Sequence, residues 1–139
     1  MKKAVIIYNS KHGTTKKYAE EIGKYLGQKG ISTKTVSISD YSDSLMTGAD
    51  YLFLGCWTSG LFFFLQHPEK IWKDFAEKLP KQLPSKIVLF TTYKALTGSM
   101  FNGMRKELKT AAGSASTELK SRDGSLSQAD KLLLDRFIG

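Results

Sequence analysis

The segment AVIIYNSKHGTTKKYAEEI, residues 4–22, decides how the chain begins to fold. It opens with an apolar run, residues 4–8, that lacks period-2 alternation, as strands buried on both faces of a parallel sheet do. A loop follows in which one glycine, Gly13, lies among Ser, His and Thr side chains, and charged residues at helical spacing come next. The loop therefore joins a buried strand to a helix, and its donors can either turn the chain or bind a ligand.

Four further segments have the composition of strands. Tyr51–Leu54 and Ile87–Phe90 are apolar runs like residues 4–8, and we predict that they are central strands of the same sheet. Ser32–Ile38 and Thr117–Lys120 mix polar and apolar residues, and we predict that they lie at its two edges.

Helical patterns lie between these strands. The first one stops near Gly30, and the second lies between Pro68 and Pro80. Ser127 and Asp130 have the spacing of a capping box at the start of a last helix. The side chains that define the four patterns are Tyr18, Ala19, Ile22, Tyr25 and Leu26; Ile71, Trp72, Phe75 and Leu79; Phe101, Met104 and Leu108; and Leu132, Leu133, Arg136 and Phe137.

The alternation of strands and helices indicates the fold class. It is typical of an α/β protein whose parallel sheet is covered by helices on both faces, with Tyr41–Met46 as a short, poor helix after the second strand. With the polar strands at the edges, the order of the five strands is 2-1-3-4-5. We therefore predict a three-layer sandwich that forms a single domain over residues 1–139.

Composition indicates where the protein works and what it contacts. The single cysteine, Cys56, excludes an internal disulfide and fits a reducing compartment. The apolar run after Met1–Lys3 is too short for a signal peptide or a membrane span, so we expect a cytoplasmic protein. The net charge of +8 suits anionic ligands or acidic proteins. Because the lysines are dispersed and no RNA-binding signature accompanies them, we expect no nucleic acid partner.

Ligands of such folds bind beyond the carboxyl ends of the strands, where the strand order reverses. Here that place lies between the first and third strands, and the relevant loops are residues 9–15, 56–66 and 91–99. The first loop precedes a helix N-terminus, which suits a phosphate group. It contains neither GxGxxG nor GxxxxGK(S/T), nor the cysteine and arginine of a tyrosine-phosphatase loop. These absences exclude dinucleotide, nucleoside triphosphate and phosphatase chemistry.

The first loop also carries a family resemblance. The decapeptide IIYNSKHGTT, residues 6–15, followed by Ala19 and Ile22, resembles the phosphate-loop signature of the flavodoxins. In that signature two aliphatic residues and an aromatic precede Ser or Thr, and Gly, Thr, Ala and an aliphatic residue follow. Leu54-Gly55-Cys56 at the end of the third strand and an uninterrupted fifth strand extend the resemblance to short-chain flavodoxins. The resemblance implies a flavodoxin-like fold and an FMN-binding redox protein that carries electrons between protein partners.

The resemblance implies a cofactor site as well. The FMN phosphate is expected on the phosphate loop, Ser10–Thr15, and the isoalloxazine ring between the loops that follow the third and fourth strands. We expect no catalytic residue and no metal. The expected cofactor-binding residues are Ser10, Lys11, His12, Gly13, Thr14, Thr15, Trp57, Thr58, Ser59, Gly60, Leu61, Thr91, Thr92, Tyr93, Lys94 and Gly98.

Three features bear on function beyond the resemblance. Flavodoxins are usually acidic, whereas this chain is basic, which favours acidic redox partners for a monomer or weak dimer. Ser59 stands where many members place an aromatic that stacks on the ring, so Trp57 or Tyr93 is the candidate for that contact. The run Phe62–Phe64 favours an alternative, an FMN-dependent enzyme acting on a small apolar acceptor such as a quinone or a porphyrin precursor. A binding module that does not hold FMN tightly is a third alternative.

Overall fold

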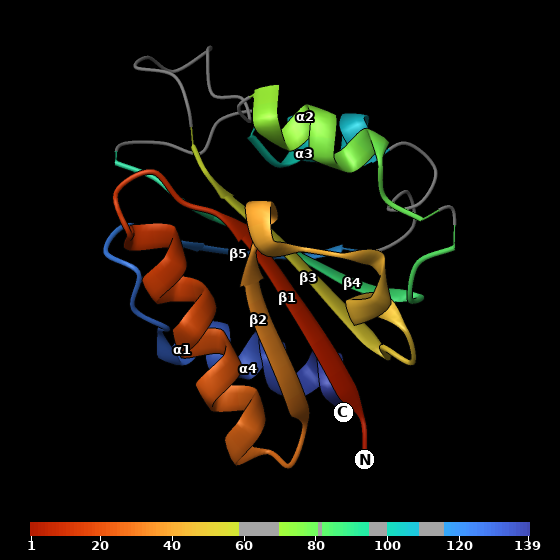
Figure 1. Ribbon diagram of the computed structural model, residues 1–139. Coiled ribbons are helices and arrows are strands. Elements are labelled where there is room, and N and C mark those ends of the chain that lie inside the picture. Colours follow the sequence, from red (N-terminus) through yellow and green to blue (C-terminus); the bar gives the residue numbers. More distant parts are fainter. Residues whose placement is uncertain (59–69, 81, 95–99, 109–115) are drawn as a thin grey trace.

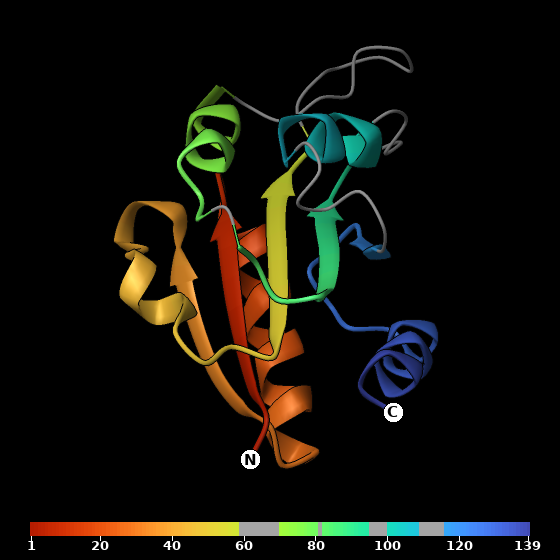
Figure 2. The same ribbon diagram turned by 90° about the vertical axis from the view of Figure 1, so that its right-hand side faces the viewer.

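Five parallel strands form one sheet in the computed structural model of this chain, which describes all residues except 59–69, 81, 95–99 and 109–115. The strands are β1 (Lys3–Asn9), β2 (Ser32–Ser37), β3 (Tyr51–Trp57), β4 (Lys86–Thr92) and β5 (Ser116–Ser121). Their order across the sheet is β2-β1-β3-β4-β5, which confirms the predicted order. Figure 2 shows the arrowheads of β1, β3 and β4 pointing the same way, as parallel pairing requires.

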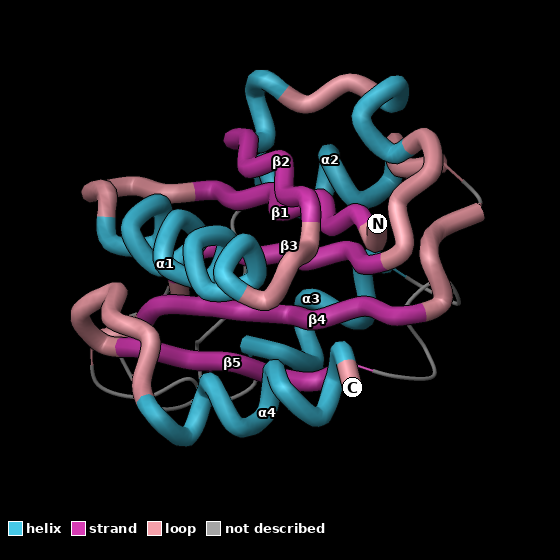
Figure 3. The backbone as a smooth tube through the Cα atoms, turned by 90° about the horizontal axis from the view of Figure 1, so that it is seen from below, coloured by secondary structure: helices cyan, strands magenta, loops and turns pink. Residues whose placement is uncertain are grey.

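The α-helices of the described part of the chain cover both faces of this sheet. They are α1 (Thr14–Gln28), α2 (Lys70–Glu77), α3 (Met100–Leu108) and α4 (Gln128–Ile138). α1 and α4 lie on one face, and α2 and α3 lie next to each other on the opposite face (Figure 1; Figure 3). The three layers confirm the predicted sandwich.

Successive residues of the central strands supply two hydrophobic cores, one on each face of the sheet. Ile7 packs in the core that contains Trp72 of α2, whereas its neighbour Ile6 packs in the core that contains Ile22 of α1. All four side chains are fully buried. Burial on both faces explains why the central strands consist of unbroken apolar runs rather than alternating ones.

The connection between β2 and β3 differs from the prediction. The segment forms two short 3-10 helices, Ile38–Asp40 (η1) and Asp43–Met46 (η2), where the sequence predicts one helix at Tyr41–Met46. β2 accordingly ends at Ser37 and not at Ile38. The segment is rich in Ser and Asp, whose side chains bond locally; for example, the hydroxyl oxygens of Ser42 and Ser44 are 2.9 Å apart. Such local bonds favour turns over a regular α-helix.

Two helices bury a different stripe from the predicted one. In α2, Ile71 is 46% exposed while Trp72 is fully buried, so placing both on the buried face is wrong. In α4, Leu132 and Leu133 are exposed, and Leu134 is the leucine that faces the core. Neighbouring residues of a helix differ by about 100° in direction, so a short apolar run cannot face the sheet as a whole.

Side-chain hydrogen bonds fasten α4 to α1. The Tyr18 hydroxyl donates to Asp130 Oδ2 over 2.8 Å, and the Tyr25 hydroxyl donates to Asp135 Oδ1 over 2.6 Å. Asp130 also closes the capping box with Ser127, as the sequence predicts. Burial and the adjacent Asp130 carboxylate raise the pKa of Tyr18 far above its usual value, so its hydroxyl stays protonated and keeps donating. These bonds fix α1, the helix that begins in the phosphate loop.

Gly55 allows a large side chain to fill the space between the sheet and α1. A Cβ atom at Gly55 would overlap the ring of Phe90, its partner on β4. The Phe90 ring lies edge-on to Tyr18, with 5.9 Å between the ring centroids. The glycine at the end of the third strand therefore has a packing role beneath the phosphate-loop helix.

Candidate functional site

The loops predicted to hold a ligand meet at the end of the sheet where the strands have their carboxyl ends. Asn9 and Cys56 are the last Cα partners of β1 and β3, and Trp57 and Thr92 are the last partners of β3 and β4. Because the strands are parallel, the segments that follow them all start at this carboxyl end of the sheet. The strand order reverses between β1 and β3, so the expected crevice lies beyond the carboxyl ends of these two strands.

The phosphate loop is shaped by its own backbone and hydroxyl groups. The Gly13 N–H donates to Ser10 Oγ over 3.0 Å, and Gly13 adopts φ 88°, a left-handed conformation that favours glycine. α1 begins directly afterwards at Thr14, and a glycine N-cap has no side chain that could accept hydrogen bonds from the first turn. The N–H groups of that turn have no intrahelical acceptor, so they suit an anion.

Threonine hydroxyls join the strand ends behind the loop. Thr15 and Thr92 are both buried, and their Oγ1 atoms are 2.6 Å apart. Thr91 is buried too, and its hydroxyl donates to the Cys56 carbonyl oxygen over 2.6 Å. The Oγ1 atom of Thr58 lies 2.9 Å from that of Thr91. These four residues, all predicted to bind the cofactor, thus form hydrogen bonds with one another and with β3 behind the phosphate loop. Their direct contact with a cofactor stays a prediction.

Trp57 and Tyr93, the two aromatic residues predicted to contact the ring, are partly exposed at this end of the sheet, and each has a cation over its ring. Lys11 Nζ is 4.7 Å from the ring centroid of Trp57, so the phosphate loop contacts the end of β3. The ring of Tyr93 has the Arg122 guanidinium at 5.4 Å and Lys120 Nζ at 6.0 Å. These distances lie within the range of cation–π attraction.

Lys120 and Arg122 lie beside Tyr93, although the sequence alone does not predict this. The register of β4 and β5 pairs Thr92 with Ser121, so the residues that follow each strand lie side by side. The Tyr93 N–H also donates to the Ser121 carbonyl oxygen over 3.2 Å. Knowledge of the pairing register of β5 would have predicted that both cations lie near Tyr93, but the polar sequence of this edge strand does not specify a register.

The loop after β5 reaches the start of α1. Gly124 adopts φ 84°, and a Cβ atom there would lie 2.8 Å from the Thr14 carbonyl oxygen. Lys17 Nζ donates to the Asp123 carbonyl oxygen over 3.4 Å. The Ser125 N–H donates to the Asp123 carboxylate and is the main reason that the pKa of Asp123 is lowered. Close packing of this loop brings the end of β5 next to the phosphate loop.

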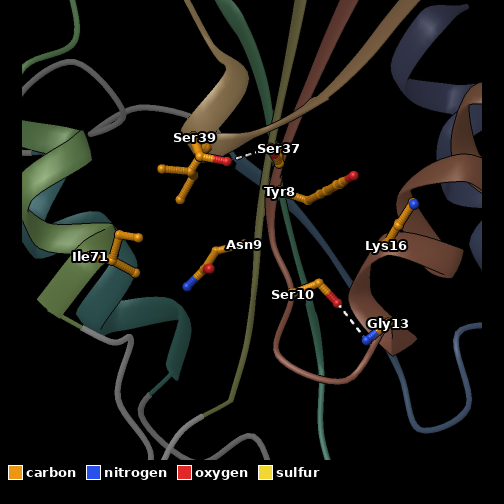
Figure 4. Close-up of a pocket in the computed structure, with 9 residues that line it drawn as sticks. Tyr8, Asn9, Ser10, Gly13, Lys16, Ser37, Ser39 and Ile71 are labelled. Carbon is orange, nitrogen blue, oxygen red and sulfur yellow. Dashed lines mark hydrogen bonds between the residues drawn. The ribbon is translucent and has the colours of Figure 1, made fainter.

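A hollow of about 270 Å³ opens beside the phosphate loop, on the side of β2 (Figure 4). In the close-up, the hydrogen-bonded pair Ser10 and Gly13 lies at one end, and Lys16 extends from the first turn of α1. The Lys16 ammonium adds positive charge to a helix end that already favours anions. The hollow is lined by Tyr8, Asn9, Ser10, Gly13, Lys16, Ser37, Ile38, Ser39 and Ile71.

Several predictions concern residues outside the described ranges. Of the predicted positions within those ranges, Lys11, His12, Gly13 and Lys94 are exposed. The described residues contain no group of three or more His, Cys, Asp or Glu that could hold a metal ion. Among the helices that the structure describes, none is long and apolar enough to cross a membrane. The predicted site residues outside the described ranges are Ser59, Gly60, Leu61 and Gly98, and the run Phe62–Phe64 lies there too.

The fold and the loop after β1 define a class of protein: a doubly wound α/β protein in which a helix without a side-chain cap begins where the strand order reverses. A family model described as Flavodoxin matches residues 6–121. The chain belongs to the flavodoxin family, and its function is that of a flavodoxin, an FMN-binding electron carrier.

Solved structures of flavodoxins share this fold. The solution structure of two-electron reduced Megasphaera elsdenii flavodoxin matches with a TM-score of 0.71 at 19% identity, over 98% of this chain and 99% of that one. A Streptococcus pneumonia flavodoxin matches with a TM-score of 0.71 at 18% identity, over 97% and 94%. A short-chain flavodoxin associated with a bacterial microcompartment matches with a TM-score of 0.70 at 19% identity, over 99% and 94%.

Proposed function

We propose that the FMN phosphate binds to the phosphate loop, on Ser10, His12, Gly13, Thr14 and Thr15. The observation that supports this most directly is the start of α1, where a glycine at φ 88° leaves the first-turn N–H groups without a side-chain cap. A phosphate there accepts hydrogen bonds from those groups and is stabilised by the helix dipole and by Lys16. Because the loop lacks the glycine spacing that passes a pyrophosphate, FMN fits better than FAD or NAD.

The isoalloxazine ring is proposed to lie between the loops that follow β3 and β4. Trp57 and Tyr93 offer aromatic surface there, and Lys11 connects the phosphate loop to Trp57. Bound FMN supplies one- and two-electron transfer, while the chain holds the ring and leaves part of it accessible to a partner. Redox proteins are the partners of a flavodoxin. We propose that this carrier is cytoplasmic and that its partners are acidic, because its net charge is +8.

Titration of the apoprotein with FMN and with riboflavin tests the site. Both ligands carry the same ring, and only FMN carries the phosphate, so FMN should bind more tightly. Thr14→Ala should weaken binding of FMN and leave riboflavin unchanged. Thr33→Ala, on β2 at the opposite end of the sheet, is the matched control and should affect neither ligand. Equal affinity for FMN and riboflavin in the wild type would refute the phosphate site.

A further inference from the structure

A cluster of exposed cations surrounds Tyr93 beside the proposed ring site. Tyr93 and Lys94 follow β4, while Lys120 and Arg122 belong to the end of β5 and the residue after it. Lys120 and Arg122 are exposed, and both have their charged groups within 6.0 Å of the Tyr93 ring centroid. We call these four residues the basic patch.

Within the described part of the chain, two acidic residues of β5 and the loop after it, Glu118 and Asp123, already have partners. Glu118, on β5, forms a salt bridge with Arg105 of α3. Asp123 accepts hydrogen bonds from the Ser125 N–H and from the Ser121 hydroxyl, and these bonds lower the pKa of its carboxyl group. Asp123 therefore stays charged and held in its own loop, and the three cations of the basic patch outnumber it.

We propose that the basic patch is the docking surface for an acidic redox protein, an inference that rests on the proposed FMN site. A cationic rim around a ring site raises the encounter rate with a negatively charged partner and orients it toward the ring. The patch also has the composition of an interface centre, an aromatic side chain flanked by Arg. Electron transfer favours a protein over a nucleic acid as the occupant, because the partner's own redox centre must come close to the flavin.

A charge-reversal pair with a matched control tests this surface. In the FMN-loaded protein, Lys120→Glu with Arg122→Glu reverses the patch. Lys24→Glu with Lys34→Glu makes the same change in net charge on exposed residues of α1 and β2. The probes are a reduced acidic [2Fe–2S] ferredoxin, which gives one electron to the oxidised flavin, and ferricytochrome c, a basic protein that takes one electron from the reduced flavin. Stopped-flow absorbance follows both reactions.

The patch variant should react about tenfold more slowly with the ferredoxin at low salt and faster with cytochrome c. The control variant should change each rate by about twofold at most, and both differences should shrink in about 0.5 M salt. Equal effects in the two variants would mean that net charge alone acts and would overturn the proposal. So would a single-stranded oligonucleotide that binds the patch more tightly than oxidised ferredoxin does.

A binding measurement separates this inference from the proposed cofactor site. Oxidised ferredoxin titrated into the protein and monitored by NMR requires no electron transfer and no reduced flavin. Loss of binding in the patch variant, with binding retained in the control, supports the docking surface even if FMN proves to bind elsewhere. Retention of ferredoxin binding in the patch variant overturns the docking surface and leaves the FMN site standing.

Discussion

The hydrogen bond between Thr15 and Thr92 should couple the phosphate-loop helix to the end of β4. Both side chains are buried, and their hydroxyl oxygens are 2.6 Å apart. Thr15→Val or Thr92→Val removes one hydroxyl and leaves the other buried without its partner, which costs about 1–3 kcal/mol. Replacing both by valine removes both polar groups, so the double variant should be close to the wild type.

Urea unfolding of the apoprotein, followed by circular dichroism, measures this coupling. With a slope of about 2 kcal/mol/M, a loss of about 2 kcal/mol moves the midpoint by about 1 M in each single variant. The double variant should recover most of that shift. Thr47→Val, on an exposed threonine before β3, is the control and should move the midpoint little.

Additivity would refute this reasoning. If the midpoint of the double variant lies below that of the wild type by the sum of the two single shifts, the two hydroxyls do not stabilise each other. FMN titration adds a second readout. We expect Thr15→Val to weaken FMN binding by about 1–3 kcal/mol through the lost phosphate contact, and Thr92→Val to weaken it less.

Three further predictions concern packing, the ring contact and the redox potential. Gly55→Ala should lower the free energy of unfolding by about 1–3 kcal/mol in thermal unfolding, because its Cβ atom overlaps the Phe90 ring; an unchanged melting temperature would contradict this. FMN fluorescence should be quenched in the wild type and partly restored by Trp57→Ala or by Tyr93→Ala; unchanged emission in both would exclude both rings as contacts. Lys94→Glu should lower the redox potential of the semiquinone–hydroquinone couple of FMN, and a redox titration should show a larger shift at low salt than at high salt. An unchanged potential would show that charge at this position has no influence.

The strand order is predictable from the sequence because burial differs so clearly between the centre and the edges of the sheet. Neighbours such as Ile6 and Ile7 are buried in different cores, so the central strands are apolar throughout. Ser32–Ser37 and Ser116–Ser121 each pair on one side alone and keep polar residues. The position of the phosphate loop then follows from the rule that ligands bind where the strand order reverses.

The residues around the loop are less predictable, because tertiary contacts select them. Ile71 and Trp72 are adjacent and both apolar, and the packing of α2 on the sheet decides that Trp72 is the buried one. Arg122 is one of many dispersed basic residues until the register of β5 brings it to Tyr93. The sequence thus predicts the loops of the site and misses the side chains that distant segments contribute.

The bonds between α1 and α4 also form late during synthesis of the chain. Tyr18 and Tyr25 bind carboxylates that lie 112 and 110 residues later in the chain. At about 5–20 residues per second, a ribosome needs roughly 5–20 s to supply them. An isolated helix as short as the 15 residues of α1 is only marginally stable in water during that interval. Some contacts of the phosphate-loop helix thus form only after α4 has been translated, so we expect stable loading of the cofactor to follow translation of α4 rather than of the loop itself.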